Sequence, residues 1–479
     1  MKLLPCAAAL ALTALSTVTL AAGVPFPSTY HAAPSAPVLI KGATLLTGTG
    51  ERLDDQDLIL SGGQIKAIGK NLAAPEGARV IEGKSLWVTP GLIDIHSHLG
   101  VYPSPATSGN ADGNEMTNPV TANVWAEHSV WPQDPGFEMA LEGGITTLQI
   151  LPGSGNLIGG RSVVLKNVHA DTTEAMKFPG AAYGLKMACG ENPKRVYGSK
   201  GSFPMTRMGD VAGYRQAFAD AQDYQQQLDK YQRELAAYEK KKSEPKDEDK
   251  KSKDKDKEKE KDSPPTQPKR DLKLETLAAV MRGEIRVHMH CYRADEMTTM
   301  LDVADEFNFK IAAFHHAVEA YKIADHLAER GVCAAMWADW WGFKMEAFDG
   351  IQENLPFVDY PKNSCAIVHS DSEDGIQRLN QEAAKSMAHA ARIGLTVPPE
   401  RAIRWLTLNP AKSLGLEDRI GSLEVGKNAD VVIWNGTPFS VYALAEEVFI
   451  DGALVYERAH PPEPPPSDFL LGQTGEVTP

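Results

Sequence analysis

Several strand-like segments of the sequence end in histidine or aspartate. His96 and His98 close LIDIHSH, His290 closes RVHMH, His316 closes KIAAFHH, and Asp371 follows AIVHS. Residues at i and i+2 of a strand point to the same side, so the imidazoles of His96 and His98 can reach one ion. A single histidine of this kind is usually a hydrogen-bonded core residue. Their repetition at successive strand ends instead predicts a divalent metal site, with zinc as the expected ion.

The segments between these residues predict the scaffold that would bring them together. Short apolar runs alternate with helical patterns, as in RVHMH followed by ADEMTTMLDVADEF, and KIAAFHH followed by VEAYKIADHLAERG. Such alternation favours βα units and therefore an α/β fold with a parallel sheet or barrel. In a barrel the C-terminal ends of the strands meet at one mouth, which is where the metal site would lie.

Both ends of the chain have a different pattern. The segments VLIKGATLL, DLILSGGQIKAIG and LWVTPG near the N-terminus alternate apolar and polar residues, and ADVVIWNG and EEVFIDGALVYE repeat this near the C-terminus. Period-two alternation is typical of half-buried strands. The two ends are therefore predicted to be β-rich.

The sequence resembles the amidohydrolase superfamily, and most closely its branch of imidazolonepropionase and Xaa-Pro dipeptidase-like enzymes. The resemblance covers about residues 38–457 without the charged insertion. Its motifs are PGLIDIHSHLG, GITTLQILPGSGNLIGG, GLKMACGENPKR, RVHMHCYRADE, HSDSEDG, TLNPAKSLGL and IGSLEVGKNADVVIW. It implies a (β/α)8 TIM barrel beside a small β-sandwich that both chain ends build together.

The resemblance also implies roles for individual residues. His96 and His98 match the first-strand metal ligands, His290 the fifth-strand ligand, His316 the sixth-strand ligand, and Asp371 the eighth-strand carboxylate. Members with two ions bridge them with a carboxylated lysine or a glutamate, and members with one ion use neither.

The segment GLKMACGEN offers both kinds of bridging residue. Glu191 is favoured, because its carboxylate is an oxygen ligand without modification, and Lys186 is the alternative. One or two ions per chain are therefore expected.

Other residues are expected near the mouth without binding the ion. His288, His315 and His369 are predicted to lie behind the ligands or to face the substrate, with an ordinary core position as the alternative. Neighbours such as His315 and His316 point to opposite sides of a strand, so only one is expected to enter the mouth. Trp340 is a candidate for an aromatic wall, with core packing as the alternative. The glycine-rich segment 153–160 precedes a strand and not a helix, which favours a tight turn over a phosphate-binding loop.

The predicted chemistry is hydrolysis of a carbon–nitrogen bond of amide, cyclic amide or dipeptide type. A divalent ion lowers the pKa of bound water to about 7, so that the water can attack a carbonyl carbon at neutral pH. Asp371 is the predicted catalytic residue, which accepts the proton of the water and delivers it to the leaving nitrogen. The alternatives are a mononuclear deaminase or imidazolone-ring hydrolase, and a non-catalytic envelope scaffold that uses the charged insertion.

Composition limits the partners. The 479 residues include 49 Lys and Arg against 63 Asp and Glu, a net charge of −14, which argues against nucleic acid and for a small-molecule substrate. The composition also permits a homo-oligomer. The five cysteines, at positions 6, 189, 291, 333 and 365, show no CxxC spacing, and the four outside the N-terminal segment are predicted to be buried free thiols.

The first residues are typical of a cleaved secretory signal, since an apolar run follows Lys2 and small residues end it. A secreted or periplasmic protein without stable membrane insertion is expected. Residues 239–269 contain 12 Lys and 10 Asp or Glu and predict a solvated loop. The expected organisation is a signal peptide (1–22), a linker (23–37), a β-sandwich (38–89 and 415–460), a barrel (90–414) with a helical and charged insertion (213–270), and a flexible tail (461–479).

Overall fold

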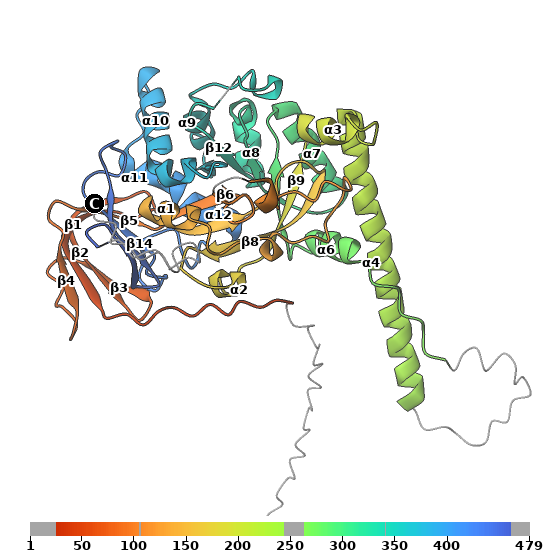
Figure 1. Ribbon diagram of the computed structural model, residues 1–479, viewed down its shortest axis with the longest axis horizontal. Helices are drawn as coiled ribbons and strands as arrows, with labels where there is room; N and C mark the ends of the chain where they lie inside the picture. The colour runs from red at the N-terminus through yellow and green to blue at the C-terminus, as the bar shows by residue number, and fades with distance from the viewer. Residues whose placement is uncertain (1–24, 105–106, 244–262, 341, 461–479) are drawn as a thin grey trace, which may run out of the picture.

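The computed structural model of the chain describes residues 25–104, 107–243, 263–340 and 342–460 (Figure 1). The predicted signal peptide, the predicted tail and most of the charged loop lie outside these residues.

Eight strands form one sheet that curves into a barrel. Along the sheet they follow the order of the chain, from β6 to β13. The strands are β6 (Leu92–Ser97), β7 (Ile145–Ile150), β8 (Ile158–Lys166), β9 (Gly184–Ala188), β10 (Arg286–His290), β11 (Ile311–His315), β12 (Cys333–Met336) and β13 (Ala366–Val368). Nearly all of their residues are buried, as expected for a sheet that is covered on both faces. The predicted eight-stranded barrel is confirmed.

One strand departs from the regular (β/α)8 pattern. β8 pairs antiparallel with both β7 and β9, whereas the other neighbours pair parallel. Only residues 151–157 join β7 to β8, and a parallel crossover needs about a dozen residues or more. The chain therefore turns back on itself within residues 151–157, and the glycine-rich segment 153–160 forms part of this turn, as predicted, together with the first residues of β8.

Helices connect and cover the strands. They are α1 (Gly136–Glu142), α2 (Thr173–Met176), α3 (Glu191–Gly198), α4 (Arg207–Ser243), α6 (Leu272–Met281), α7 (Ala294–Glu306), α8 (Ala324–Arg330), α9 (Asn354–Asp359), α10 (Leu379–Arg392), α11 (Pro399–Ala402) and α12 (Leu408–Leu414). In α7 the buried residues Met297, Met300, Leu301 and Ala304 recur at spacings of three and four, so one face of the helix packs on the barrel.

Residues beyond the end of β13 close the barrel against β6. The backbone N–H of Asp371 donates to the carbonyl oxygen of His96 at 3.0 Å. The hydroxyl of Ser370 contacts the buried carboxylate of Asp94 and lies 3.1 Å from the same His96 oxygen. This seam joins residues that are about 275 positions apart and places Asp371 next to the first strand.

The two chain ends meet in a second sheet. It contains β1 (Val38–Leu46), β2 (Arg52–Ser61), β3 (Gln64–Gly69), β4 (Arg79–Glu82), β5 (Trp87–Pro90), β14 (Val431–Trp434), β15 (Ala445–Ile450) and β16 (Ala453–Glu457). β5 pairs antiparallel with β14, and Leu45, Ile65, Val431 and Phe449 share one core. The prediction that both ends build one β domain is confirmed.

The helical part predicted for the insertion 213–270 is present as α4, which begins before the insertion at Arg207. Its buried residues end at Tyr224, and its C-terminal half extends beyond the barrel (Figure 1). Among the helices that the structure describes, none combines the length and apolar character that crossing a bilayer requires.

Four cysteines form two disulfides, so the prediction of free thiols is wrong. Cys189 pairs with Cys291, and Cys333 pairs with Cys365. The partners are 102 and 32 residues apart in the sequence and become neighbours only because consecutive barrel strands lie side by side. No local spacing could therefore have revealed these pairs.

Charged side chains cluster at the base of α4. Arg207 pairs with Glu296 at 2.9 Å and also with Glu346. Asp210, one turn further along, is 2% exposed, and neither of its carboxylate oxygens has a hydrogen-bond partner among the described residues. Burial, together with the neighbouring Glu296 and Glu346, raises the pKa of Asp210 to about 7, although Lys194 and Arg207 oppose this effect.

This raised pKa predicts that Asp210→Asn stabilises the protein above neutral pH. The pKa of Asp210 is about 7 in the folded protein and about 4 in the unfolded chain. The folded protein therefore loses stability as the pH rises from about 4 to about 7, because ionisation of Asp210 is less favourable in the folded state. We expect the melting temperature of Asp210→Asn to exceed that of the wild type by roughly 2–5 °C at pH 8, and the difference to vanish near pH 4. Thermal unfolding at both pH values measures this. Asp220→Asn, at an exposed site on the same helix, is the matched control and should show no such pH-dependent gain.

Candidate metal centre

Two histidines of the first barrel strand meet the carboxylate beyond the last one. The Nε2 atoms of His96 and His98 each lie 3.3 Å from Oδ1 of Asp371. Ligand atoms of the three residues all fall within 4.8 Å of one another, which is a spacing that one ion can bridge. The sequence predicted this group from strands that are far apart in the chain, and the seam between β13 and β6 brings it together.

A second group shares His96. Ligand atoms of His96, His316 and His369 also lie within 4.8 Å of one another, and all three residues are buried. Neither ring nitrogen of His369 has a hydrogen-bond partner among the described residues, and Nδ1 of His316 has none either. His369, which was expected behind the ligands or facing the substrate, therefore lies among the potential ligands.

His315 and His316 both turn into the barrel, which strand alternation alone would forbid. His316 has a φ of 58°, in the left-handed region, directly after β11 ends at His315. The backbone therefore leaves the strand conformation between the two residues. Asp371 also has a φ of 59°. Such conformations are rare outside glycine and cluster at functional sites.

A row of imidazoles supports His96 from behind. Nδ1 of His96 lies 2.8 Å from Nδ1 of His315, and Nε2 of His315 lies 3.0 Å from Nδ1 of His288. In each pair one nitrogen donates and the other accepts. His288 and His315 thus hold the ring of His96 and leave its Nε2 directed at Asp371.

The ring of His98 is fixed by the backbone. Its Nδ1 lies 2.8 Å from the carbonyl oxygen of Leu151. A carbonyl oxygen only accepts, so Nδ1 carries a proton, and Nε2 is the ring nitrogen that faces Asp371. This is the usual arrangement of a metal-binding histidine.

His290 lies beside the second group, with its ring centroid 4.7 Å from that of His316. Nδ2 of Asn192 lies 3.3 Å from its Nε2, and its Nδ1 has no partner among the described residues. His290 therefore lacks the carbonyl contact that fixes the ring of His98.

The two candidates for the bridging position lie in different places. Nζ of Lys186 lies 3.4 Å from Nε2 of His96 and donates to the carbonyl oxygen of Pro152 at 3.0 Å. Glu191 begins α3, and its Oε1 lies 3.8 Å from Nζ of Lys344. The structure thus brings Lys186 to the imidazole cluster and places Glu191 at the rim of the mouth.

Burial keeps the imidazoles neutral. It lowers the pKa of His288 and His369 to about 3, and it lowers the pKa of His96, His290 and His316 as well. A neutral imidazole has a lone pair available for a metal ion.

The two other charged groups of the cluster are also shifted. Burial lowers the pKa of Lys186 to about 7, although Asp371 opposes the shift. Burial acts to raise the pKa of Asp371, but His316 and His98 outweigh it and hold that pKa well below its ordinary value. The site therefore combines neutral nitrogen ligands with one carboxylate, a donor set that suits zinc and similar ions.

Aromatic side chains form a wall above the cluster. Trp337 stacks on His316 with ring centroids 4.5 Å apart, and Trp340 stacks on Trp337 at 5.1 Å. Trp340 is 40% exposed, so it faces the entrance and is not packed in the core. Nζ of Lys344 lies 4.6 Å above the ring of Tyr292 and donates to Oδ1 of Asn192 at 3.2 Å.

Comparison with known proteins agrees with this architecture. The family model for the amidohydrolase family matches residues 365–456. An amidohydrolase structure from Thermotoga maritima MSB8 is 34% identical and superposes with a TM-score of 0.75, covering 88% of this chain and 100% of that one. The chain belongs to the amidohydrolase superfamily.

Curated relatives of this amidohydrolase match over different lengths. Amidohydrolase tasK of Hapsidospora irregularis is 30% identical over 418 residues, or 84% of this chain and 40% of that protein. The chain thus spans less than half of that relative. An imidazolonepropionase of Shewanella oneidensis is 46% identical over 65 residues, which is 12% of this chain and 16% of that protein.

Some residues at the mouth of this amidohydrolase escaped sequence reasoning. Asp94 lies two positions before His96 on the same face of β6, so strand alternation could have found it. Asn192 is in helix α3 and Lys344 follows β12 without belonging to a helix or strand, so the strand-end pattern that found the histidines marks neither of them. Ser370 follows His369 directly but contacts Asp94 only because the barrel closes.

The contact between Ser370 and Asp94 predicts that Ser370→Ala destabilises the folded protein. Removing the hydroxyl leaves the buried carboxylate of Asp94 short of a donor, which should cost about 1–3 kcal/mol of the free energy of unfolding, as measured by urea titration. Ser386 is equally buried, but its hydroxyl has no partner among the described residues, so Ser386→Ala is the matched control and should be nearly neutral. Equal effects of the two substitutions would contradict the role assigned to the seam.

Proposed function

We propose that the chain is an exported, metal-dependent hydrolase of carbon–nitrogen bonds, of amide, cyclic amide or dipeptide type. The observation that carries the proposal is the convergence of His96, His98, His316 and Asp371 at the mouth of the barrel. Several buried imidazole nitrogens there have no hydrogen-bond partner in the part of the chain that the structure describes, and such buried polar atoms are costly unless a ligand satisfies them.

The proposed ligands divide between two positions. His96, His98 and Asp371 would hold one ion, and His290 and His316 would hold a second, with zinc as the expected metal. His369 is an additional candidate from its place beside His96 and His316. For the bridging position Lys186 is favoured over Glu191, because Lys186 contacts His96 whereas Glu191 faces Lys344. A lysine would have to be carboxylated to supply the oxygen ligands.

When bound, a divalent ion supplies activated water and polarises the substrate carbonyl. The side chains of the protein would do the rest. Asp371, held between His96 and His98, would accept a proton and deliver it to the leaving nitrogen. Trp337 would cover His316 and exclude bulk water, and Trp340 would meet the substrate at the entrance.

Metal analysis tests the ligand assignment. We expect about two zinc ions per chain in protein purified without chelator, and loss of metal in the His96→Ala/His98→Ala double variant, because two ligands of the first position are removed. Elemental analysis measures the metal, and a screen of dipeptides, acylated amino acids and cyclic amides measures turnover. A wild-type protein that binds no zinc or manganese and hydrolyses none of these compounds would refute the proposal.

The proposed proton transfer predicts a large loss of turnover in Asp371→Asn. An amide cannot accept the proton, so kcat should fall by about 10²–10⁴-fold. Asp339→Asn is the matched control, because Asp339 follows β12 near the mouth but pairs with Lys385 at 2.9 Å. Its kcat should stay within about threefold of the wild type. Comparable losses in the two variants would remove Asp371 from its assigned role.

A reaction with one ion is the second candidate. The match to an imidazolonepropionase supports it, as does the position of Glu191 away from the imidazole cluster. One ion per chain, retained in Lys186→Met, would favour this reading over the two-ion hydrolase.

Export is supported by the two disulfides. Disulfides persist in oxidising compartments and are rare in the cytosol of most organisms. N-terminal sequencing of the protein from the cell envelope or medium tests the proposal. We expect a mature chain that starts soon after Ala22, and an intact N-terminus in a cytosolic fraction would contradict export.

A further inference from the structure

The two disulfides lie at opposite ends of the barrel. Cys189 and Cys291 directly follow β9 and β10, so their bond joins the C-terminal ends of neighbouring parallel strands. Cys333 is the first residue of β12, and Cys365 directly precedes β13, so their bond joins the N-terminal ends of another parallel pair. Only the first disulfide borders the candidate metal centre.

The Cys189–Cys291 bond lies close to the candidate ligands along the chain. Cys291 is the residue after His290, and Cys189 is three residues after Lys186. The N–H of Cys189 donates to the carbonyl oxygen of His290 at 2.9 Å, and the N–H of Cys291 donates to that of His315 at 3.0 Å. The covalent link therefore stands at the point where the hydrogen-bonded ladder of these strands ends.

His290 depends on this link more than His96 and His98 do. The ring of His98 is held by the carbonyl oxygen of Leu151, and the ring of His96 by His315. Nδ1 of His290 has no partner among the described residues, and its Nε2 meets only the side chain of Asn192. The position of its imidazole is thus set mainly by its backbone, which the disulfide restrains.

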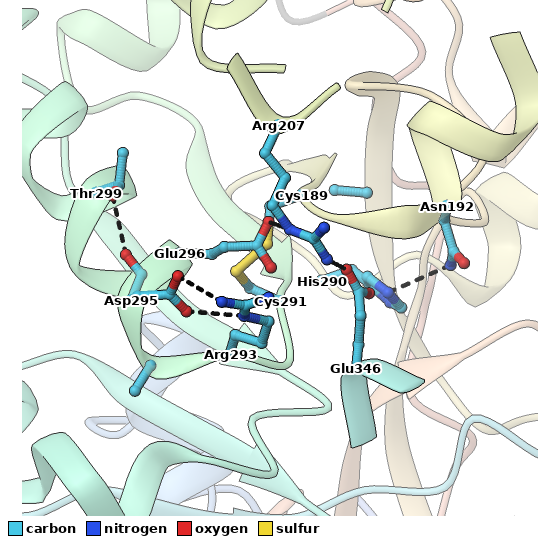
Figure 2. The surroundings of a disulfide bond; sticks show 12 residues. Cys189, Asn192, Arg207, His290, Cys291, Arg293, Asp295, Glu296, Thr299 and Glu346 are labelled. Atoms are coloured by element: carbon cyan, nitrogen blue, oxygen red, sulfur yellow. Dashed lines mark hydrogen bonds and ion pairs between the residues drawn. A yellow bond between two sulfur atoms is a disulfide. The ribbon is translucent and has the colours of Figure 1, made fainter. Parts of the chain in front are cut away.

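The loop after Cys189 is restrained from the other side as well (Figure 2). The N–H of Glu191 donates to Oε1 of Glu346 at 2.6 Å, and Arg207 joins Glu346 to Glu296. Gly190 has a φ of 81°, and a Cβ there would lie 2.3 Å from Glu346 Oε1, so the loop fits closely against this carboxylate. Asn192, the only side chain that hydrogen-bonds to Nε2 of His290 among the described residues, is the second residue of α3, which follows this loop directly.

We propose that the Cys189–Cys291 disulfide is a positioning cross-link for the metal centre, which holds His290 and the N-terminus of α3, with Asn192, at the spacing that metal binding requires. The inference rests on the proposed metal site. It adds that tight metal binding requires the intact disulfide as well as the ligand residues. Outer contacts that orient a ligand typically change metal affinity by about 10–100-fold when they are removed.

The test compares two double variants of the full chain. Cys189→Ala/Cys291→Ala removes the cross-link at the mouth, and Cys333→Ala/Cys365→Ala removes the matched one at the opposite end. Both should lower the melting temperature, the first more strongly because it closes the longer loop. The melting temperature therefore does not distinguish a general stabilising role from a positioning role at the metal centre. The dissociation constant for zinc distinguishes them, when it is measured by chelator competition well below the melting temperatures of both variants.

We expect the zinc dissociation constant to rise at least about tenfold in the mouth variant and to stay within about twofold of the wild type in the control. Hydrogen exchange of the metal-free proteins gives an independent readout. Amides of residues 287–292 should exchange faster in the mouth variant only. If that variant folds poorly, Cys189→Val/Cys291→Ala refills the volume left by the sulfur pair and takes its place.

Each outcome bears on a different statement. Unchanged zinc affinity in the mouth variant, or equal losses in both variants, would overturn the positioning role and leave the proposed function intact. A wild-type protein that binds no zinc or manganese and hydrolyses none of the screened compounds would instead refute the proposed function. In that case unchanged exchange of residues 287–292 in the metal-free mouth variant would overturn the positioning role separately.

Discussion

The candidate site depends on the closure of the barrel between its last and first strands. The strands of the sheet pair in order from β6 to β13, and among the described residues β6 and β13 do not pair with each other. The N–H of Asp371 and the hydroxyl of Ser370, both directed at β6, span this gap. Since Asp94 is buried, the hydroxyl of Ser370 also satisfies a carboxylate that would otherwise be costly. The same contacts that close the fold therefore set the distance between Asp371 and the two histidines of β6.

The cluster inside this closed barrel is expensive to maintain without a ligand. His96, His316 and His369 are buried together, and burial of Lys186 beside them adds a fourth basic group. Burial keeps these imidazoles neutral, so charge repulsion among them is small, but some of their nitrogens have no hydrogen-bond partner within the described ranges. The left-handed backbone at His316 adds a further local cost. Costs of this kind persist where function requires them, and an ion would satisfy the same nitrogens.

The features that could be predicted from the sequence are those that produce a repeating pattern within a short segment of the chain. The HxH spacing of His96 and His98, the strand-helix alternation and the β-rich chain ends all follow from periodicity, and each is present. The direction of β8, the disulfides and the inward turn of both His315 and His316 were not found, because each depends on tertiary contacts or on a single backbone angle. The choice between Lys186 and Glu191 also depends on tertiary contacts. Both residues lie near the end of β9, and only the fold shows that Lys186 approaches His96.

The disulfide at the mouth also bears on which ligands an ion would meet. Thiolates bind zinc strongly, and two free cysteines beside His290 would offer sulfur ligands at the edge of the same cluster. Pairing Cys189 with Cys291 removes both thiols and leaves nitrogen and oxygen donors only. A centre with such donors keeps its ligand set only where the cross-link stays oxidised, as it does in an exported protein. The N-terminal sequence pattern and the chemistry of the mouth are therefore consistent with the same oxidising compartment, although they arise from separate parts of the chain.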